Sequence, residues 1–168
     1  MSQAKNKIEW CLRKAEKELK ESGRHRGLVK NKSDYAKAKE YLQKAEHYLK
    51  ATEYLKKGDF SDIGASTVFY SMYHCLLAIA AKHGYDSRNQ ECTFALIYYL
   101  IEEGRIDLEP EIINKIASLE TKNDEDTSVK IRERYQYGTE FTVREDLYNK
   151  LVGLAKEVLS KTKTIVED

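Results

Sequence analysis

Mostly apolar residues recur every three or four positions along most of the chain, which is the spacing of one face of an α-helix. The clearest such stripe begins after Ser33 or Asp34, either of which can cap a helix, and it ends at Gly58-Asp59. Its members are Tyr35, Ala38, Leu42, Ala45, Leu49, Thr52 and Leu55. The pattern therefore predicts one long amphipathic helix between these two signals.

The segment that follows differs because it is apolar on nearly every side. It runs from Asp59 or Ser61 to about Lys82, and we predict a helix there at the centre of a bundle. Its most apolar stretch, Thr67 to Ala81, is interrupted by His74 and by hydroxyl groups, and it is shorter than a bilayer requires. We therefore expect a core helix and no membrane segment.

The rest of the pattern predicts further helices separated by short polar breaks. They are expected over residues 3–22, about 89–103, 110–119, a segment containing 131–137, and about 142–164, with a polar loop at 123–127. The one proline, Pro110, stands near a first turn, where a missing N–H costs least. The sequence thus predicts an all-α, antiparallel up-and-down bundle over residues 34–168, preceded by a helix and a basic connection over residues 1–33.

Composition narrows the function only a little. The chain has 168 residues, 41% of them hydrophobic, which is enough for one domain with a core of its own. Its 29 Lys and Arg against 28 Asp and Glu leave a net charge of +1, so bulk charge does not favour nucleic-acid binding. Basic residues gather in residues 1–57 and acidic ones in 102–126, which permits a local basic patch.

The three cysteines give no recognisable site. Cys11, Cys75 and Cys92 are odd in number and widely spaced, and they form neither a CxxC pair nor a metal-ligand set. The N-terminus lacks the apolar core of a signal peptide, so we expect free thiols in a reducing cytoplasm. Cys92 opens a predicted helix, where a low-pKa reactive thiol is the less favoured alternative to a structural cysteine.

Four stretches together resemble the HEPN superfamily, named for higher eukaryotes and prokaryotic nucleotide-binding proteins. The segment Ala65-Ser-Thr-Val-Phe-Tyr-Ser-Met-Tyr-His74 is similar to that family's Tyr-Tyr-Ala-Met-Phe/Tyr-His helix, and 131–137 is similar to its Leu-Arg-x-x-Ala-Asp-Tyr segment. The other two are 38–50 and 84–94. The resemblance covers roughly residues 34–164 and implies the HEPN helical bundle, with an extra N-terminal helix.

The resemblance also implies a chemistry that this chain only partly matches. Catalytic members are metal-independent endoribonucleases with an Arg followed after four to six residues by His, in a site completed across a dimer. The cation stabilises the phosphate while imidazole assists attack by the RNA 2′-OH. Here Arg132 occupies the Arg position, but Tyr137 stands where His is expected and no His follows. A phenol with a pKa near 10 is a poor general base at neutral pH.

Phosphate binding is the function we expect of Arg132, with Gln136 or Tyr137 beside it on the helix. Arg134 lies two residues on and points to another face, where it too could reach phosphate. The alternative is that both arginines pair with nearby acids such as Glu133 or Glu140 on a solvated surface.

His74 and the basic connection are weaker candidates. His74 follows Tyr70 by one helical turn and most simply is a hydrogen-bonded core residue, although near Arg132 it could supply the missing imidazole. Arg24 and Arg26 could touch a phosphate backbone, or could serve only to keep the connection solvated. The chain's twelve tyrosines could stack bases, but those on the second helix are more simply boundary residues.

We therefore expect a nucleotide-, RNA- or partner-binding module that forms a homodimer. By resemblance it would be a toxin–antitoxin or stress-response component that works with a small nucleotidyltransferase. One alternative is a metal-independent endoribonuclease using Arg132 with His74 or Tyr137, and another is a structural interaction subunit. No cofactor is expected.

Overall fold

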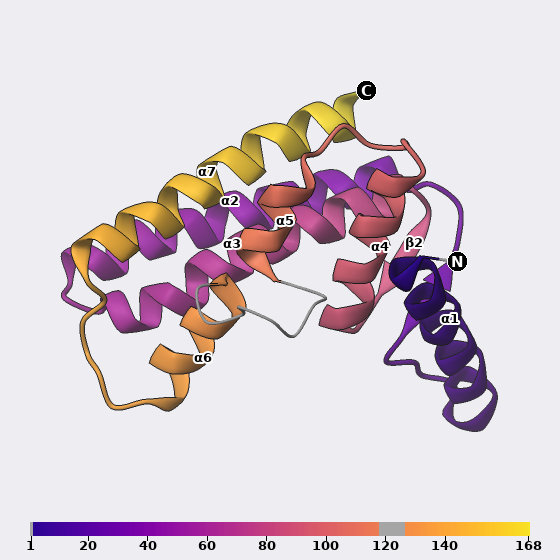
Figure 1. Cartoon of the computed structure of the whole chain (residues 1–168), viewed down its shortest axis with the longest axis horizontal. Helices are drawn as coiled ribbons and strands as arrows, with labels where there is room; N and C mark the ends of the chain where they lie inside the picture. The colour runs from indigo at the N-terminus through magenta and orange to yellow at the C-terminus, as the bar shows by residue number, and fades with distance from the viewer. Residues whose placement is uncertain (1, 118–126) are drawn as a thin grey trace.

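A computed structural model describes residues 2–117 and 127–168, and within these ranges the chain forms seven helices and two short strands (Figure 1). Their bounds are α1 Gln3–Ser22, β1 Leu28–Lys30, α2 Tyr35–Lys57, α3 Ser61–Lys82, β2 Tyr85–Ser87, α4 Gln90–Glu102, α5 Pro110–Ile116, α6 Ser128–Tyr137 and α7 Glu145–Glu167. The predicted all-α bundle is confirmed.

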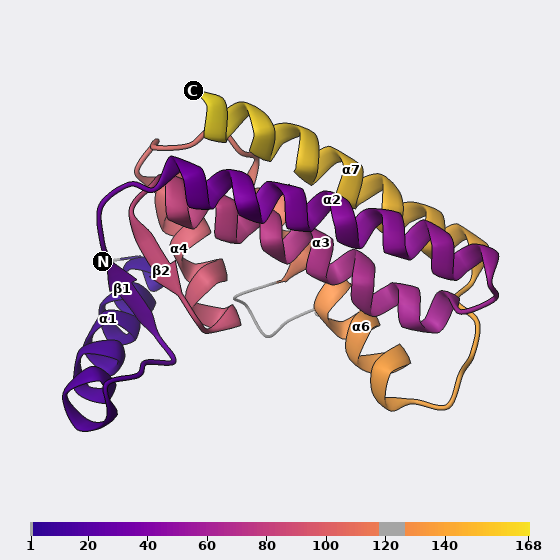
Figure 2. The same ribbon diagram turned by 180° about the vertical axis from the view of Figure 1, so that it is seen from behind.

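Helix α2 forms where the pattern predicts it. The Asp34 side chain caps it by accepting a hydrogen bond from the Lys37 backbone N–H, and Gly58 ends it. Its buried residues are Ala38, Leu42, Ala45, Leu49 and Thr52. This stripe packs on α3, and Figures 1 and 2 show the two helices running side by side along the bundle.

Helix α3 is the centre of the bundle, as expected from its composition. It packs against α2, α6 and α7, and most of its residues are buried. At 22 residues the whole helix is longer than the stretch Thr67 to Ala81, and by length and composition alone it could cross a membrane. However, 67% of its most apolar window is buried inside the protein, which is the environment of a core helix.

The sequence did not predict the antiparallel pair of β1 and β2. Leu28 lies opposite Ser87 and Lys30 opposite Tyr85 in this pair. Three residues are too few to show the two-residue period of a strand, so the sequence pattern predicts only a basic connection there. Residues 2–33, which we call the N-terminal arm, instead fold against the end of the bundle (Figure 1).

The expectation of free thiols is wrong for two of the three cysteines. Cys11 of α1 and Cys92 of α4 form a disulfide with an S–S distance of 2.04 Å, across 81 positions of sequence. Cys92 is therefore not the reactive thiolate considered above. Cys75 is free and buried, and its burial raises the thiol pKa to about 12. Spacing could not reveal the pair because it forms only when α1 packs on α4.

Two other boundaries differ from the prediction or cannot be compared with it. Helix α7 starts at Glu145 and not near residue 142, because Arg144 keeps a non-helical backbone with ψ 141° and is the N-cap. The preceding Val143 backbone N–H donates to the Ser61 hydroxyl at 2.9 Å. Helix α5 ends at Ile116 and not near residue 119, because Ala117 already has an extended backbone and caps the helix. Most of the loop predicted at 123–127 lies outside the described residues.

Candidate functional site

The guanidinium of Arg132 lies against the aromatic side of α3. Helix α6 is anchored there by its buried residues Ile131 and Tyr135, which leaves the Arg132 side chain 11% exposed. Its Cζ atom is 4.6 Å from the centre of the Phe69 ring, and Nη1 donates to the Tyr70 hydroxyl at 3.4 Å. The charge is thus held in place largely by a cation–π contact.

Few polar partners reach this guanidinium. Its Nε atom is buried and has no hydrogen-bond partner among the described residues. The nearest carboxylate oxygen, on Glu133, is 3.8 Å from Nη2, which is too long for a hydrogen bond, and Glu133 also faces Lys130 at 3.5 Å. A guanidinium offers several N–H donors in a planar fork. Arg132 therefore keeps donors that a bound anion could use.

His74 has a defined tautomer. Its Nδ1 atom is 2.7 Å from the Tyr70 carbonyl oxygen, which can only accept, so Nδ1 carries the proton and Nε2 keeps its lone pair in the neutral ring. Burial lowers the pKa of His74, the Tyr70 hydrogen bond opposes this, and the charge of Lys44 lowers it further. The ring is therefore a neutral imidazole near pH 7.

Four half-buried rings continue from Arg132 along α2 and α3. Tyr48 lies 5.8 Å from Tyr70 and 5.1 Å from His74, and Tyr41 lies 6.0 Å from His74, between ring centres. We call Tyr41, Tyr48, Tyr70 and His74 the aromatic row. In Figure 2, α2 and α3 face the viewer and no other element is drawn across them. All four side chains are partly exposed, so the row is reachable from solvent.

The structure brings Arg132 and His74 into the same surface without direct contact. Tyr70 joins them, since its hydroxyl accepts from Arg132 and its carbonyl accepts from His74. Tyr137, at the end of α6, is 77% exposed, and no hydrogen bond links it to Arg132 among the described residues. Of the two residues proposed to replace the motif His, only His74 lies beside the arginine site.

The remaining predicted phosphate ligands lie elsewhere. Arg134 binds the Glu140 carboxylate through Nε and Nη2, at 3.2 and 3.0 Å, which is the surface pairing considered as an alternative. Gln136 is exposed on α6. Arg24 and Arg26 are exposed in the connection between α1 and β1, at the other end of the molecule from α6 (Figure 1).

Sequence reasoning missed two members of this site. The Phe69 ring packs against the guanidinium, and the Tyr48 ring lies near the rings of both Tyr70 and His74. The helical spacing of Tyr70 and His74 was visible, but nothing local in the sequence indicates which ring α6 will cover. Among the described residues, no group of three or more His, Cys, Asp or Glu side chains could hold a metal ion.

The fold and the site define a helical bundle that presents a motif arginine beside its central helix. The family model of the HEPN domain matches residues 38–165, which is more than half of the chain. The chain therefore belongs to the HEPN domain family, and it is a nucleotide- or RNA-related module in the general sense of that family. A comparison with curated proteins found no significant match. The matched region leaves out α1 and β1.

Proposed function

We propose that this protein binds single-stranded RNA on the face formed by α2, α3 and α6, with Arg132 as the phosphate clamp. The observation that carries the proposal is the shortage of partners for the Arg132 guanidinium: its buried Nε has none among the described residues, and the Glu133 oxygen is 3.8 Å from Nη2. A largely buried cation without a bonded anion is costly, and a planar guanidinium matches two phosphate oxygens at once. A phosphate would bind the exposed part of the guanidinium and neutralise its charge, because the protein itself covers Nε.

The aromatic row supports RNA over an isolated phosphate ion. Partly exposed rings offer faces on which unpaired bases can stack, at about 1–3 kcal/mol per base. Lys44 lies 5.4 Å above the Tyr48 ring and adds a positive charge beside the row. Because the net charge of the chain is only +1, we expect few phosphate contacts and a shallow dependence of affinity on salt.

The test is binding of a labelled single-stranded RNA, measured by fluorescence anisotropy at two salt concentrations. We expect Arg132→Ala to weaken binding about tenfold or more, and Arg132→Lys to recover only part of the loss because lysine cannot bind bidentately. Arg144→Ala is the matched control, since Arg144 is an exposed arginine that pairs with Asp146. Equal affinity of wild type and Arg132→Ala would refute the clamp.

A second candidate is metal-independent RNA cleavage, favoured by the free Nε2 lone pair of His74. In that reaction Nε2 takes the 2′-OH proton, the 2′-oxygen bonds to phosphorus, and the bond to the 5′-oxygen breaks. The imidazolium then returns the proton to the departing 5′-oxygen. The products are a 2′,3′-cyclic phosphate and a 5′-hydroxyl, and Arg132 stabilises the phosphorane charge.

Incubation with RNA in the presence of a chelator separates the two candidates. Cyclic phosphate ends made by the wild type, and not by His74→Gln or Arg132→Ala, would establish the enzyme. Cleavage lost in Tyr137→Phe and kept in His74→Gln would assign the proton transfer to Tyr137 instead. Intact RNA, bound by the wild type, would leave the binding module.

We further propose a homodimer, supported by exposed apolar residues at one end of the bundle. Phe60 and Ile63 are 53% and 50% exposed, and Phe141 is 80% exposed. The hydrogen bond from Val143 to Ser61 brings the α6–α7 connection to the start of α3, so these residues gather in one region. Such patches commonly mark protein interfaces. Sedimentation should show a dimer that Ile63→Asp converts to monomer, while Leu19→Asp on α1 does not.

The biological setting remains a proposal that rests on the family alone. We propose a cytoplasmic toxin–antitoxin or stress-response component whose partner is a small nucleotidyltransferase. An adjacent reading frame for such an enzyme, and its co-purification with this chain, would support the assignment. A stable complex in which Arg132→Ala has no effect on RNA would instead favour a structural interaction subunit.

A further inference from the structure

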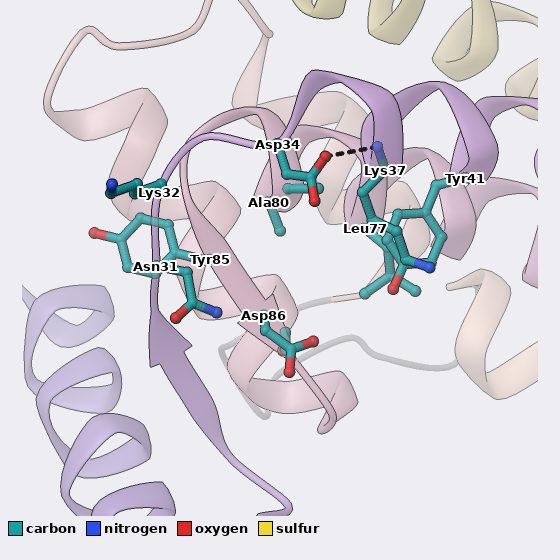
Figure 3. A pocket seen from close by; sticks show the side chains of 11 residues that line it. Asn31, Lys32, Asp34, Lys37, Tyr41, Leu77, Ala80, Tyr85 and Asp86 are labelled. Atoms are coloured by element: carbon teal, nitrogen blue, oxygen red, sulfur yellow. Dashed lines mark hydrogen bonds between the residues drawn. The ribbon is translucent and has the colours of Figure 1, made fainter.

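A small cavity lies where the N-terminal arm meets the bundle (Figure 3). Its volume is about 220 Å³, and its floor is apolar, from Leu77, Ala80 and Ala81 of α3. Figure 3 shows Asn31 and Asp86 on the side of the two strands and Tyr41 on the side of α2. We call this cavity the hairpin pocket.

We propose that the hairpin pocket binds one nucleobase of the RNA strand that Arg132 holds. The inference rests on the proposed function and names a base-reading site within it. Its starting point is Tyr41, which lines the pocket and also ends the aromatic row, 6.0 Å from His74. A strand laid along the row from Arg132 is thus led into the pocket.

The distance between the two sites suits a short strand. Tyr70 beside Arg132 and Ala80 in the pocket floor are both on α3, so the helical rise of about 1.5 Å per residue separates them by roughly 15 Å. Stacked nucleotides advance about 3.4 Å each, so roughly four of them span this distance. An oligonucleotide of eight residues would therefore occupy both sites.

The size and lining of the pocket suit a single ring system. Cavities for larger ligands measure about 300–1,000 Å³, so a volume of about 220 Å³ favours a base over a complete cofactor. The apolar floor and the Tyr41 ring can cover the faces of a base. Lys32, at the edge of the pocket, is exposed and can approach the neighbouring phosphate.

The polar groups at the rim favour bases that carry an amino group. The Asp86 carboxylate is fixed by His25 at 3.0 Å and by Arg88 at 3.3 Å, so its direction is set before a ligand arrives. A carboxylate accepts hydrogen bonds from the exocyclic amino groups of bases, and the Asn31 amide can both donate and accept. Uracil has no such amino group. We therefore expect adenine or cytosine to be preferred over uracil.

Part of this pocket lies outside the region that the family model matches. Asn31, Lys32 and Asp34 precede residue 38, while Tyr85 and Asp86 come from the strand that pairs with β1. The arm therefore completes a site that α2 and α3 alone would leave open. This position gives the arm a role in choosing the RNA, beyond its attachment to the bundle.

The test compares labelled oligo-A, oligo-C and oligo-U of eight nucleotides by fluorescence anisotropy. We expect the wild type to bind the A and C strands about fivefold or more tightly than the U strand. Asn31→Ala and Asp86→Ala should bring this ratio close to one, while oligo-U affinity stays nearly unchanged. Asn149→Ala, an exposed asparagine on α7, is the matched control. Circular dichroism confirms the fold of each variant.

The pocket and the clamp can fail separately. Arg132→Ala should lower the affinity for all three oligonucleotides by a similar factor and leave the ratio of their affinities unchanged. RNA binding that depends on Arg132 without a base preference, or a preference unchanged in both pocket variants, would overturn the pocket and leave the clamp. A preference for oligo-U would also overturn it. Absence of RNA binding by the wild type would overturn the proposed function and this inference with it.

Discussion

The helical bundle and the N-terminal arm are stabilised in different ways. The bundle buries long apolar stripes of α2, α3 and α7, whose members lie a few residues apart in sequence. The arm has few fully buried side chains and relies on pairs of residues far apart in sequence, such as Cys11 with Cys92 and His25 with Asp86. Periodic burial thus defines the bundle, while a small number of specific contacts fixes the arm.

The largest loss of stability should come from a substitution that leaves a cavity in the core of the bundle. Leu76 of α3 is fully buried, so Leu76→Ala should lower the free energy of unfolding by about 2–5 kcal/mol. Urea denaturation followed by circular dichroism measures the loss. Leu19→Ala on the arm, where Leu19 is 40% exposed, should change it by less than about 0.5 kcal/mol. Equal losses would mean that the two regions do not differ in this way.

In the N-terminal arm, the disulfide should contribute most to stability, as the buried core does in the bundle. Replacing both Cys11 and Cys92 by Ser should lower the free energy of unfolding by about 2–4 kcal/mol, because the bond closes a long loop in the unfolded chain. We expect the bundle to stay helical while proteases gain access to residues 23–33. The single variant Cys75→Ser serves as a control for loss of a thiol.

Labelling with a thiol reagent checks the same bond directly. Folded protein should take up no label, because Cys75 is buried with a raised thiol pKa. Unfolded, unreduced protein should take up one label, on Cys75. Disulfides are uncommon in a reducing cytoplasm, so three labels on protein unfolded in the thiol reagent at the moment of cell lysis would show that the bond is absent there.

The same contrast explains what the sequence could predict. The spacing of Ala38, Leu42 and Ala45 predicts α2, because buried residues follow the helical repeat. The bundle could be predicted from such stripes. Nothing of that kind marks the pairing of Leu28 with Ser87, which depends on how α1 and α4 dock. Long-range pairs carry no local period, so the strands and the disulfide were missed.

In the candidate site too, residues marked by a local sequence pattern could be predicted, and contacts between distant segments could not. Arg132 and His74 could be singled out from the motif and from helical spacing. Their surroundings could not, because the cation–π contact with Phe69 joins two helices separated in sequence. The hairpin pocket was also beyond prediction, since its walls come from the arm, α2, α3 and β2.

A smaller effect is expected where function opposes stability. Arg132 is a largely buried cation without a hydrogen-bonded carboxylate, so Arg132→Met should leave the free energy of unfolding within about 1 kcal/mol of wild type, or raise it. RNA affinity should nevertheless fall as in Arg132→Ala. Thermal denaturation and anisotropy on the same samples test both. A loss of several kcal/mol would identify Arg132 as a structural residue instead.

The smallest effect is the response of stability to pH. Burial lowers the pKa of His74 below its ordinary value of 6.5, and burial together with Arg105 and Lys82 lowers that of His83. Below about pH 6.5 the unfolded chain therefore binds protons that the folded protein resists, so the free energy of unfolding should fall as pH drops from 7.5 toward 5.5. His74→Gln should flatten this slope, whereas His47→Gln, at an exposed position of α2, should not.

Because His74 lies in the aromatic row and Arg132 donates to the adjoining Tyr70, bound RNA should change the slope of the wild type more than that of His74→Gln. Identical slopes in all three proteins, with and without RNA, would show that His74 is not coupled to the site.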